Sequence, residues 1–145
     1  MSLEENKTII RRFFTEVFSQ DNLAGADEYI APDAILHPFP PQFPSGEEGL
    51  KMVVAAMRTT FPDGQITLED LLAEGDKVFV RTFFRGTQTG PLMNMPGVPP
   101  TGKPCSQTQM HLFRLANGKI VEYWFNADDL GMLRQLGYTP VLQSS

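Results

Sequence analysis

The segment FRLANGKIVEYW, residues 113–124, decides the fold of this chain, because it contains the clearest reversal of chain direction in the sequence. Asn117 and Gly118 are the pair that two-residue β-hairpin turns prefer, since both central positions of such a turn need a positive φ. Residues of high β propensity stand on both sides of the pair. We therefore predict an antiparallel hairpin of two strands, residues 107–115 and 119–127.

A second hairpin precedes the first. Residues 66–72 and 77–85 are strand-like, and the turn-forming cluster Glu74-Gly75-Asp76 joins them. Residues 88–103, between the hairpins, contain too many prolines and glycines for a regular element. We expect this segment to be a loop at the mouth of a pocket, in which Leu92, Met93, Met95 and Val98 form an adaptable apolar lid. A contact between subunits is the alternative use of these side chains.

Helical signals dominate the N-terminal half and recur once at the C-terminus. Ser2 with Glu5, and again Ser45 with Glu48, have the form of a capping box. Apolar residues recur at helical spacing behind each box, up to Phe18 and Phe61. A second, short helix is expected over residues 23–30 and a short strand over 34–37. The last helix, residues 129–135, should end near Gly137.

This order of elements predicts a single α+β domain covering residues 1–145. A strongly curved, mainly antiparallel sheet wrapped over three N-terminal helices would form a cone-shaped barrel with an internal pocket. The 11 phenylalanines and 7 methionines supply apolar surface to line such a pocket.

Composition excludes several classes of partner and site. A net charge of −5 offers no basic surface for nucleic acid or an anionic membrane. No apolar stretch is long enough to span a bilayer, and the acidic N-terminus lacks the apolar core of a signal peptide. The single Cys105 cannot form an intrachain disulfide, which fits a cytoplasmic location. The two histidines lack a carboxylate at ligand spacing, so no metal site is expected.

Several motifs together resemble one family. They are Pro99-Pro100-Thr101-Gly102-Lys103, the hairpin segment 113–124 and the C-terminal DDLGMLRQLG at 128–137, with His37-Pro38 and Phe61-Pro62-Asp63 upstream. In order and spacing they are similar to the SnoaL-like polyketide cyclases, or ester cyclases, of the nuclear transport factor 2-like (cystatin-like) superfamily. The resemblance implies a cone-shaped α+β barrel, a homodimer or larger homo-oligomer, and no metal or redox cofactor. It also implies intramolecular aldol cyclisation of aromatic polyketide methyl esters.

The same resemblance implies where the site lies. In cyclases of this group an aspartate directly after a tryptophan is the acid/base, and a Gln-x-His pair on the neighbouring strand lines the pocket. Gln109 and His111 match the pair, and Phe125 stands where the aspartate is expected. We therefore take His111, with Gln109, as the candidate catalytic pair.

Strand alternation supports part of this assignment. Gln109, His111 and Phe113 project to one face of their strand, and a neutral imidazole in an apolar pocket can accept or donate a proton. Asp128 and Asp129 are the carboxylates nearest to Phe125, and at least one of them should cap the last helix. Alternation puts Asp128 on the face opposite Phe125, so Asp128 could replace the missing aspartate only if the strand contained a bulge. Asp128 is retained as a third catalytic candidate.

Further residues are candidates for substrate binding. His37 ends a short strand beside a proline-rich loop, from where it could close over a pocket mouth. The full substrate-binding set is His37, Phe113, Trp124, Phe125, Asn126 and Met95. Two functions stay open: a cofactor-independent cyclase or isomerase acting on a small, apolar, carbonyl-bearing substrate, and a non-catalytic protein that binds such a molecule. Phe125 favours the second.

Overall fold

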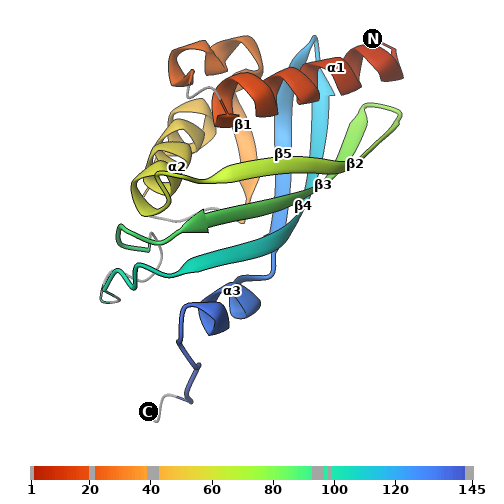
Figure 1. Ribbon diagram of the computed structural model, residues 1–145. Coiled ribbons are helices and arrows are strands. Elements are labelled where there is room, and N and C mark those ends of the chain that lie inside the picture. Colours follow the sequence, from red (N-terminus) through yellow and green to blue (C-terminus); the bar gives the residue numbers. More distant parts are fainter. Residues whose placement is uncertain (1, 20–21, 39–42, 93–96, 98, 143–145) are drawn as a thin grey trace.

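The computed structural model describes residues 2–19, 22–38, 43–92, 97 and 99–142 (Figure 1). The helical segments before the sheet are interrupted by one strand, and the remaining strands follow in two hairpins. In chain order the elements are α1 (Leu3–Phe13), the π-helix η1 (Phe14–Ser19), the 3-10 helix η2 (Leu23–Glu28), β1 (Ile30–His37), α2 (Gly46–Thr60), β2 (Gln65–Glu74), β3 (Lys77–Thr87), β4 (Pro104–Ala116), β5 (Lys119–Ala127) and α3 (Asp129–Gln135).

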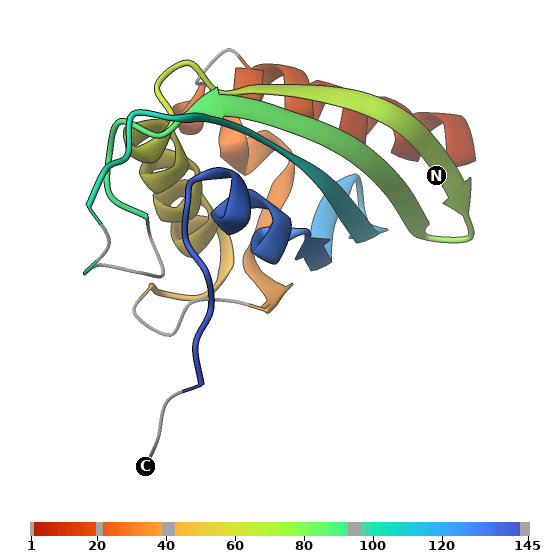
Figure 2. The ribbon, with the colours of Figure 1, turned by 60° about the horizontal axis from the view of Figure 1, so that its bottom comes forward.

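Within the described residues, five strands form one sheet in the order β1-β5-β4-β3-β2. Strands β2 to β5 pair antiparallel, and β1 pairs parallel to β5. Figure 2 shows β2, β3 and β4 curving over the helices. The predicted α+β fold with a mainly antiparallel sheet is confirmed. The sheet does not close on itself, because β1 and β2 lie at its two edges.

Both predicted hairpins form at the expected turns. Gly75 has a φ of 59°, and Asn117 and Gly118 have φ of 51° and 78°, as a turn with two left-handed positions requires. The strands extend beyond the predicted bounds at several ends, most of all at the start of β4. The predicted last helix is confirmed at residues 129–135, and Gly137 follows it with a φ of 92°.

The N-terminal helices differ in part from expectation. The capping box of Ser2 and Glu5 is present in full. The predicted helix over 23–30 is shorter, because β1 begins at Ile30 rather than at residue 34. Pro32 does not prevent this strand, since β1 is an edge strand and its register with β5 shifts between Ile30 and Ile35.

The start of α2 is set by a close backbone contact. Ser45 occupies the N-cap position but its side chain makes no capping hydrogen bond, so the second expected capping box is wrong. Gly46 follows with a φ of 76°, and a Cβ there would lie 2.2 Å from the carbonyl oxygen of Pro32. Only glycine lets α2 approach β1 this closely. This close approach sets the positions of the α2 side chains that line a pocket beside the sheet.

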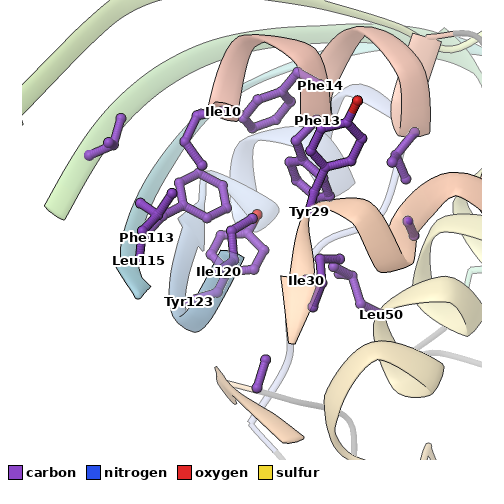
Figure 3. Close-up of a cluster of buried hydrophobic side chains, with 14 of the residues drawn as sticks. Ile10, Phe13, Phe14, Tyr29, Ile30, Leu50, Phe113, Leu115, Ile120 and Tyr123 are labelled. Atoms are coloured by element: carbon purple, nitrogen blue, oxygen red, sulfur yellow. The ribbon is translucent and has the colours of Figure 1, made fainter. Parts of the chain in front are cut away.

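The main core lies between α1, η1 and the concave face of the sheet (Figure 3). Phe13 and Phe14 pack edge-on against Phe113 of β4, with ring centroids 5.9 and 5.8 Å apart. Tyr123 of β5 stacks on Phe113, with ring centroids 4.4 Å apart. In the part of the chain that the structure describes, no helix is both long and apolar enough to cross a membrane.

Candidate active site

A pocket of about 390 Å³ opens between the concave face of the sheet and the helices, a size typical of small-molecule sites. Its apolar wall comes from η1, β1, α2, β2 and β5. These apolar lining residues are Phe18, Leu36, Pro38, Leu50, Val53, Met57, Ile66, Phe125 and Ala127. The pocket is not sealed from solvent. Its polar lining residues are His37, Gln109, His111, Tyr123, Asn126 and Asp129.

Gln109 and His111 lie on the pocket wall as the strand alternation predicted. Their side chains are 2% and 3% exposed, so they do not face solvent on the outer side of the sheet. Phe113 shares their face but lies deeper, fully buried in the core and not among the lining residues. The alternation thus identified the concave face, whereas it could not show how far along the strand the pocket extends.

A continuous hydrogen-bonded chain connects the polar groups of this wall, and we call it the polar chain. Its members in order are Asp129, Gln107, Gln109, Thr82, His111 and Tyr123. Three of its contacts join neighbouring strands, and the contact of Asp129 joins α3 to β4.

The first half of the polar chain ends at a carboxylate. The amide nitrogen of Gln107 donates to Oδ1 of Asp129 at 2.8 Å, and the amide nitrogen of Gln109 donates to Oε1 of Gln107 at 3.0 Å. The hydroxyl of Thr82 donates to Oε1 of Gln109 at 2.9 Å. Because the amide nitrogen of Gln107 donates to Asp129, its amide oxygen faces Gln109, and this contact sets the orientation of the second amide.

The second half of the polar chain fixes the tautomer of His111. Thr82 Oγ1 lies 2.9 Å from Nε2 of His111, and His111 Nδ1 lies 2.5 Å from the hydroxyl of Tyr123. The hydroxyl group of Thr82 has a single hydrogen, which it donates to Gln109. Nε2 of His111 must therefore carry a hydrogen and donate it to the hydroxyl oxygen of Thr82. Nδ1 then accepts from Tyr123. All the hydrogen bonds of the polar chain run in one direction, toward Asp129.

The electrostatics of the wall agree with this arrangement. Burial lowers the pKa of His111 to about 3, so the ring is neutral at physiological pH. Burial also raises the pKa of Tyr123, whose hydroxyl therefore keeps its proton. Aromatic rings surround the imidazole, with Phe14 edge-on at 5.0 Å and Phe125 tilted at 5.1 Å.

The two adjacent aspartates have separate positions. Asp128 is the N-cap of α3, where its Oδ1 accepts from the backbone N–H of Gly131 at 2.9 Å. It is exposed and is not among the lining residues. Asp129, one residue further along, is also exposed, but it lines the pocket and accepts from Gln107. The expectation that one of the pair caps the helix is confirmed for Asp128.

His37 lines the pocket on the opposite side, at the end of β1. Its Nε2 contacts Oε2 of Glu122 at 2.8 Å, and its ring stacks on Trp124 with centroids 5.4 Å apart. The hydrogen bond with His37, followed by that with Arg114, holds the pKa of Glu122 below its usual value. Trp124 is the pairing partner of His37 in the register of β1 with β5, and it does not line the pocket itself.

The remaining candidates divide between the pocket and the loop. Phe125 and Asn126 line the pocket, and Met95 lies outside the described residues. Of the expected lid, Leu92 packs in a second core cluster that includes Phe84 and Leu136, while 93, 95 and 98 are likewise outside the described residues. The base of the loop is held by Gln88, whose side chain accepts from Thr101.

Sequence reasoning missed three members of the polar chain. Thr82 interrupts an apolar strand face, which is itself a signal of a buried polar contact. Gln107 shares the parity of Gln109, and Tyr123 follows from the hairpin register, in which it pairs with Phe113. Asp129 was considered only as a cap.

These features agree with one known group of proteins. A profile of the SnoaL-like polyketide cyclases matches residues 8–136. The chain belongs to this family. The resemblance found in its motifs is therefore confirmed.

Relatives of this SnoaL-like protein share both its sequence and its fold. Nogalonic acid methyl ester cyclase of Streptomyces nogalater is 32% identical over 124 residues, 83% of this chain and 89% of that enzyme. TsrD of Streptomyces laurentii superposes with a TM-score of 0.83 at 27% identity, covering 94% of this chain and 98% of TsrD. IdmH of Streptomyces antibioticus gives a TM-score of 0.76 at 35% identity, covering 92% and 99%.

Proposed function

We propose that this protein is a cofactor-independent cyclase that closes a ring in an aromatic polyketide methyl ester by intramolecular aldol addition. A base removes a proton from carbon beside a carbonyl, and the resulting enolate carbon forms a C–C bond to a second carbonyl carbon. The new alkoxide then takes up a proton, so the product is an isomer of the substrate. This chemistry needs a base and hydrogen-bond donors for the developing oxyanion.

The observation that carries this proposal is the polar chain along an otherwise apolar pocket. Gln109 gives one amide hydrogen to Gln107 and keeps a second for a ligand oxygen. Donors held in place before the substrate binds stabilise an oxyanion more than water does.

His111 acts in this proposal as a positioning residue. Both of its ring nitrogens are already engaged, by Thr82 and Tyr123, and it is neutral over the physiological range. Through Thr82 it holds the carbonyl of Gln109, which turns the amide nitrogen of Gln109 toward Gln107 and the pocket. The hypothesis that His111 itself transfers the proton is less compatible with these contacts.

The proposal is tested with nogalonic and aklanonic acid methyl esters, the compounds for which the relatives are named. Ring closure is followed by chromatography, because substrate and product have equal mass, and EDTA is present to exclude metal dependence. Gln109→Leu should lower kcat about 10²- to 10³-fold. Thr108→Ala, on the outer face of the same strand, should change it less than two-fold.

A non-catalytic binding protein is the second candidate, and Phe125 favours it. An aromatic ring stands where the family resemblance implies an aspartate, and it adds apolar surface beside His111. This alternative predicts that calorimetry detects binding of the esters while the wild-type protein does not accelerate ring closure. That result would overturn the cyclase proposal.

We also infer a homodimer formed through the outer face of the sheet. One row of apolar residues crosses this face from β2 to β5, and each residue pairs with the next one on the neighbouring strand. The row is Leu72, Phe79, Leu112 and Trp124. Leu72 is 63% exposed, and nearby Met110 is 41% exposed. Light scattering at micromolar concentration should give twice the monomer mass, and Leu112→Glu should give the monomer. A monomeric wild type would contradict the inference.

A further inference from the structure

Asp129 is the acidic residue that the described structure places on the pocket wall. The other carboxylates near the site, Asp128 and Glu122, are engaged elsewhere, by the N-terminus of α3 and by His37 with Arg114. Phe125 cannot transfer a proton, and both nitrogens of His111 are occupied. A base for the aldol reaction must therefore come from another side chain that borders the pocket.

The contacts of Asp129 leave it able to act. Its Oδ1 accepts from Gln107, and within the described residues no hydrogen bond or ion pair engages its Oδ2. The carboxylate is anchored rather than free to rotate, because Gln107 is itself 6% exposed and held by Gln109. Helix α3 is fixed to β4 by Gln135, which both accepts from the backbone N–H of Ser106 and donates to its carbonyl.

We propose that Asp129 is the general base of this protein, taking over the part of the carboxylate that Phe125 replaces. This inference rests on the proposed cyclase function. In the first step Oδ2 of Asp129 takes the proton from the carbon beside the substrate carbonyl, and the C–H electron pair becomes the enolate. After the C–C bond has formed, the protonated Asp129 returns this proton to the alkoxide, so the enzyme ends unchanged.

The polar chain explains how base and oxyanion donor work together. Gln107 donates to the carboxylate and accepts from the amide of Gln109, which keeps its second hydrogen for the substrate oxygen. The side chain of Gln107 thus holds both the base, Asp129, and the donor, Gln109, which line the same pocket. A fixed separation of this kind aligns the proton to be removed with the oxygen that becomes negative.

The decisive variant is Asp129→Asn, which keeps an oxygen to accept from Gln107 but removes the basicity. Asp128→Asn is its matched comparison, since it removes the same charge one residue earlier. The assay incubates nogalonic acid methyl ester in D₂O and follows two readouts. Chromatography measures ring closure, and mass spectrometry measures deuterium gain in the unreacted ester above the protein-free rate.

Asp129→Asn is expected to lower kcat about 10²- to 10⁴-fold with KM within about three-fold, as loss of a general base does. The decrease in kcat caused by Asp128→Asn should be at least 30-fold smaller. Ring closure by Asp129→Asn within three-fold of wild type would overturn the assignment and leave the cyclase proposal standing.

The second readout separates the two proposals. If the wild type exchanges deuterium in an Asp129-dependent way but closes no ring, the base assignment stands and the cyclase proposal fails. If the wild type accelerates neither exchange nor closure, both are overturned. Equal losses in Asp128→Asn and Asp129→Asn would also overturn the assignment, because they would point to the charge or the stability of α3.

Discussion

The hydroxyl of Tyr123 lies 2.5 Å from Nδ1 of His111, and this contact completes the polar chain at its buried end. Because His111 donates through Nε2, its Nδ1 is an acceptor within a buried side chain, and Tyr123 supplies the donor it needs. Without Tyr123 the chain would end in an unsatisfied buried nitrogen. The contact therefore links the stability of the core to the geometry of the pocket.

Tyr123→Phe tests this link directly. The variant keeps the ring packing and removes only the hydroxyl, so the free energy of unfolding should fall by about 1–3 kcal/mol, the cost of leaving a buried polar atom unsatisfied. Urea denaturation at pH 7 measures it. Tyr138→Phe removes an exposed hydroxyl that donates to the carbonyl of Pro99 and should cost about 0.5 kcal/mol or less. Equal losses in the two variants would contradict the assigned role of Tyr123.

His111 predicts a pH dependence of stability. Its pKa is about 3 in the folded protein and 6.5 for an accessible histidine, so the unfolded chain binds the proton more readily. The free energy of unfolding is therefore highest above about pH 6.5, where His111 is neutral in both states. It decreases as the pH falls from there toward 3, by up to about 5 kcal/mol. Urea denaturation between pH 7 and pH 4 should show a steeper loss for wild type than for His111→Gln. Parallel curves for the two proteins would show that His111 is not buried in its neutral form.

Much of the fold could be predicted because its signals are local. The local signals are the turns at Gly75 and Asn117-Gly118, the cap of Ser2 with Glu5, and Gly137 just after the end of α3. Each depends on a few neighbouring residues. The parallel pairing of β1 with β5 could not, since Ile30 pairs with Ile120 across most of the chain. Without that pairing the helix was expected to continue to Ile30 and the strand to begin only at Ala34.

Strand alternation predicts which face of the sheet a residue of the candidate site lies on, but not where along the strand the pocket ends. Parity placed Gln109 and His111 on the concave wall, but it also grouped them with Phe113, which lies in the core. The roles of Asp128 and Asp129 depend on where α3 begins relative to the end of β5. A one-residue difference there exchanges a helix cap for a pocket carboxylate, and no local pattern in the sequence resolves it.

Gly46 should be the least replaceable of the positive-φ glycines. Gly46→Ala places a Cβ 2.2 Å from the backbone oxygen of Pro32, whereas a Cβ at Gly75 meets nothing within 4 Å. Both variants carry the cost of a left-handed residue, about 1–2 kcal/mol. Gly46→Ala should lose at least about 2 kcal/mol more, because α2 must move away from β1. Urea denaturation compares the two, and a similar loss in both would show that α2 can shift freely.

Phe125→Asp, combined with Asp129→Asn, examines whether the two positions serve one pocket. Phe125 lies 5.1 Å from the His111 ring and lines the same cavity as Asp129, so a carboxylate there reaches the space in which a substrate would lie. If Asp129 is the base, Asp129→Asn alone loses turnover, and adding Phe125→Asp should restore at least about 10-fold of the 10²- to 10⁴-fold attributed to a general base. Phe125→Asn in the same background is the matched control, since it opens the same space without a base and should restore nothing. Recovery by both would mean that the ring of Phe125 obstructs the substrate, and recovery by neither would mean that a carboxylate at position 125 cannot reach the reacting carbon in this pocket.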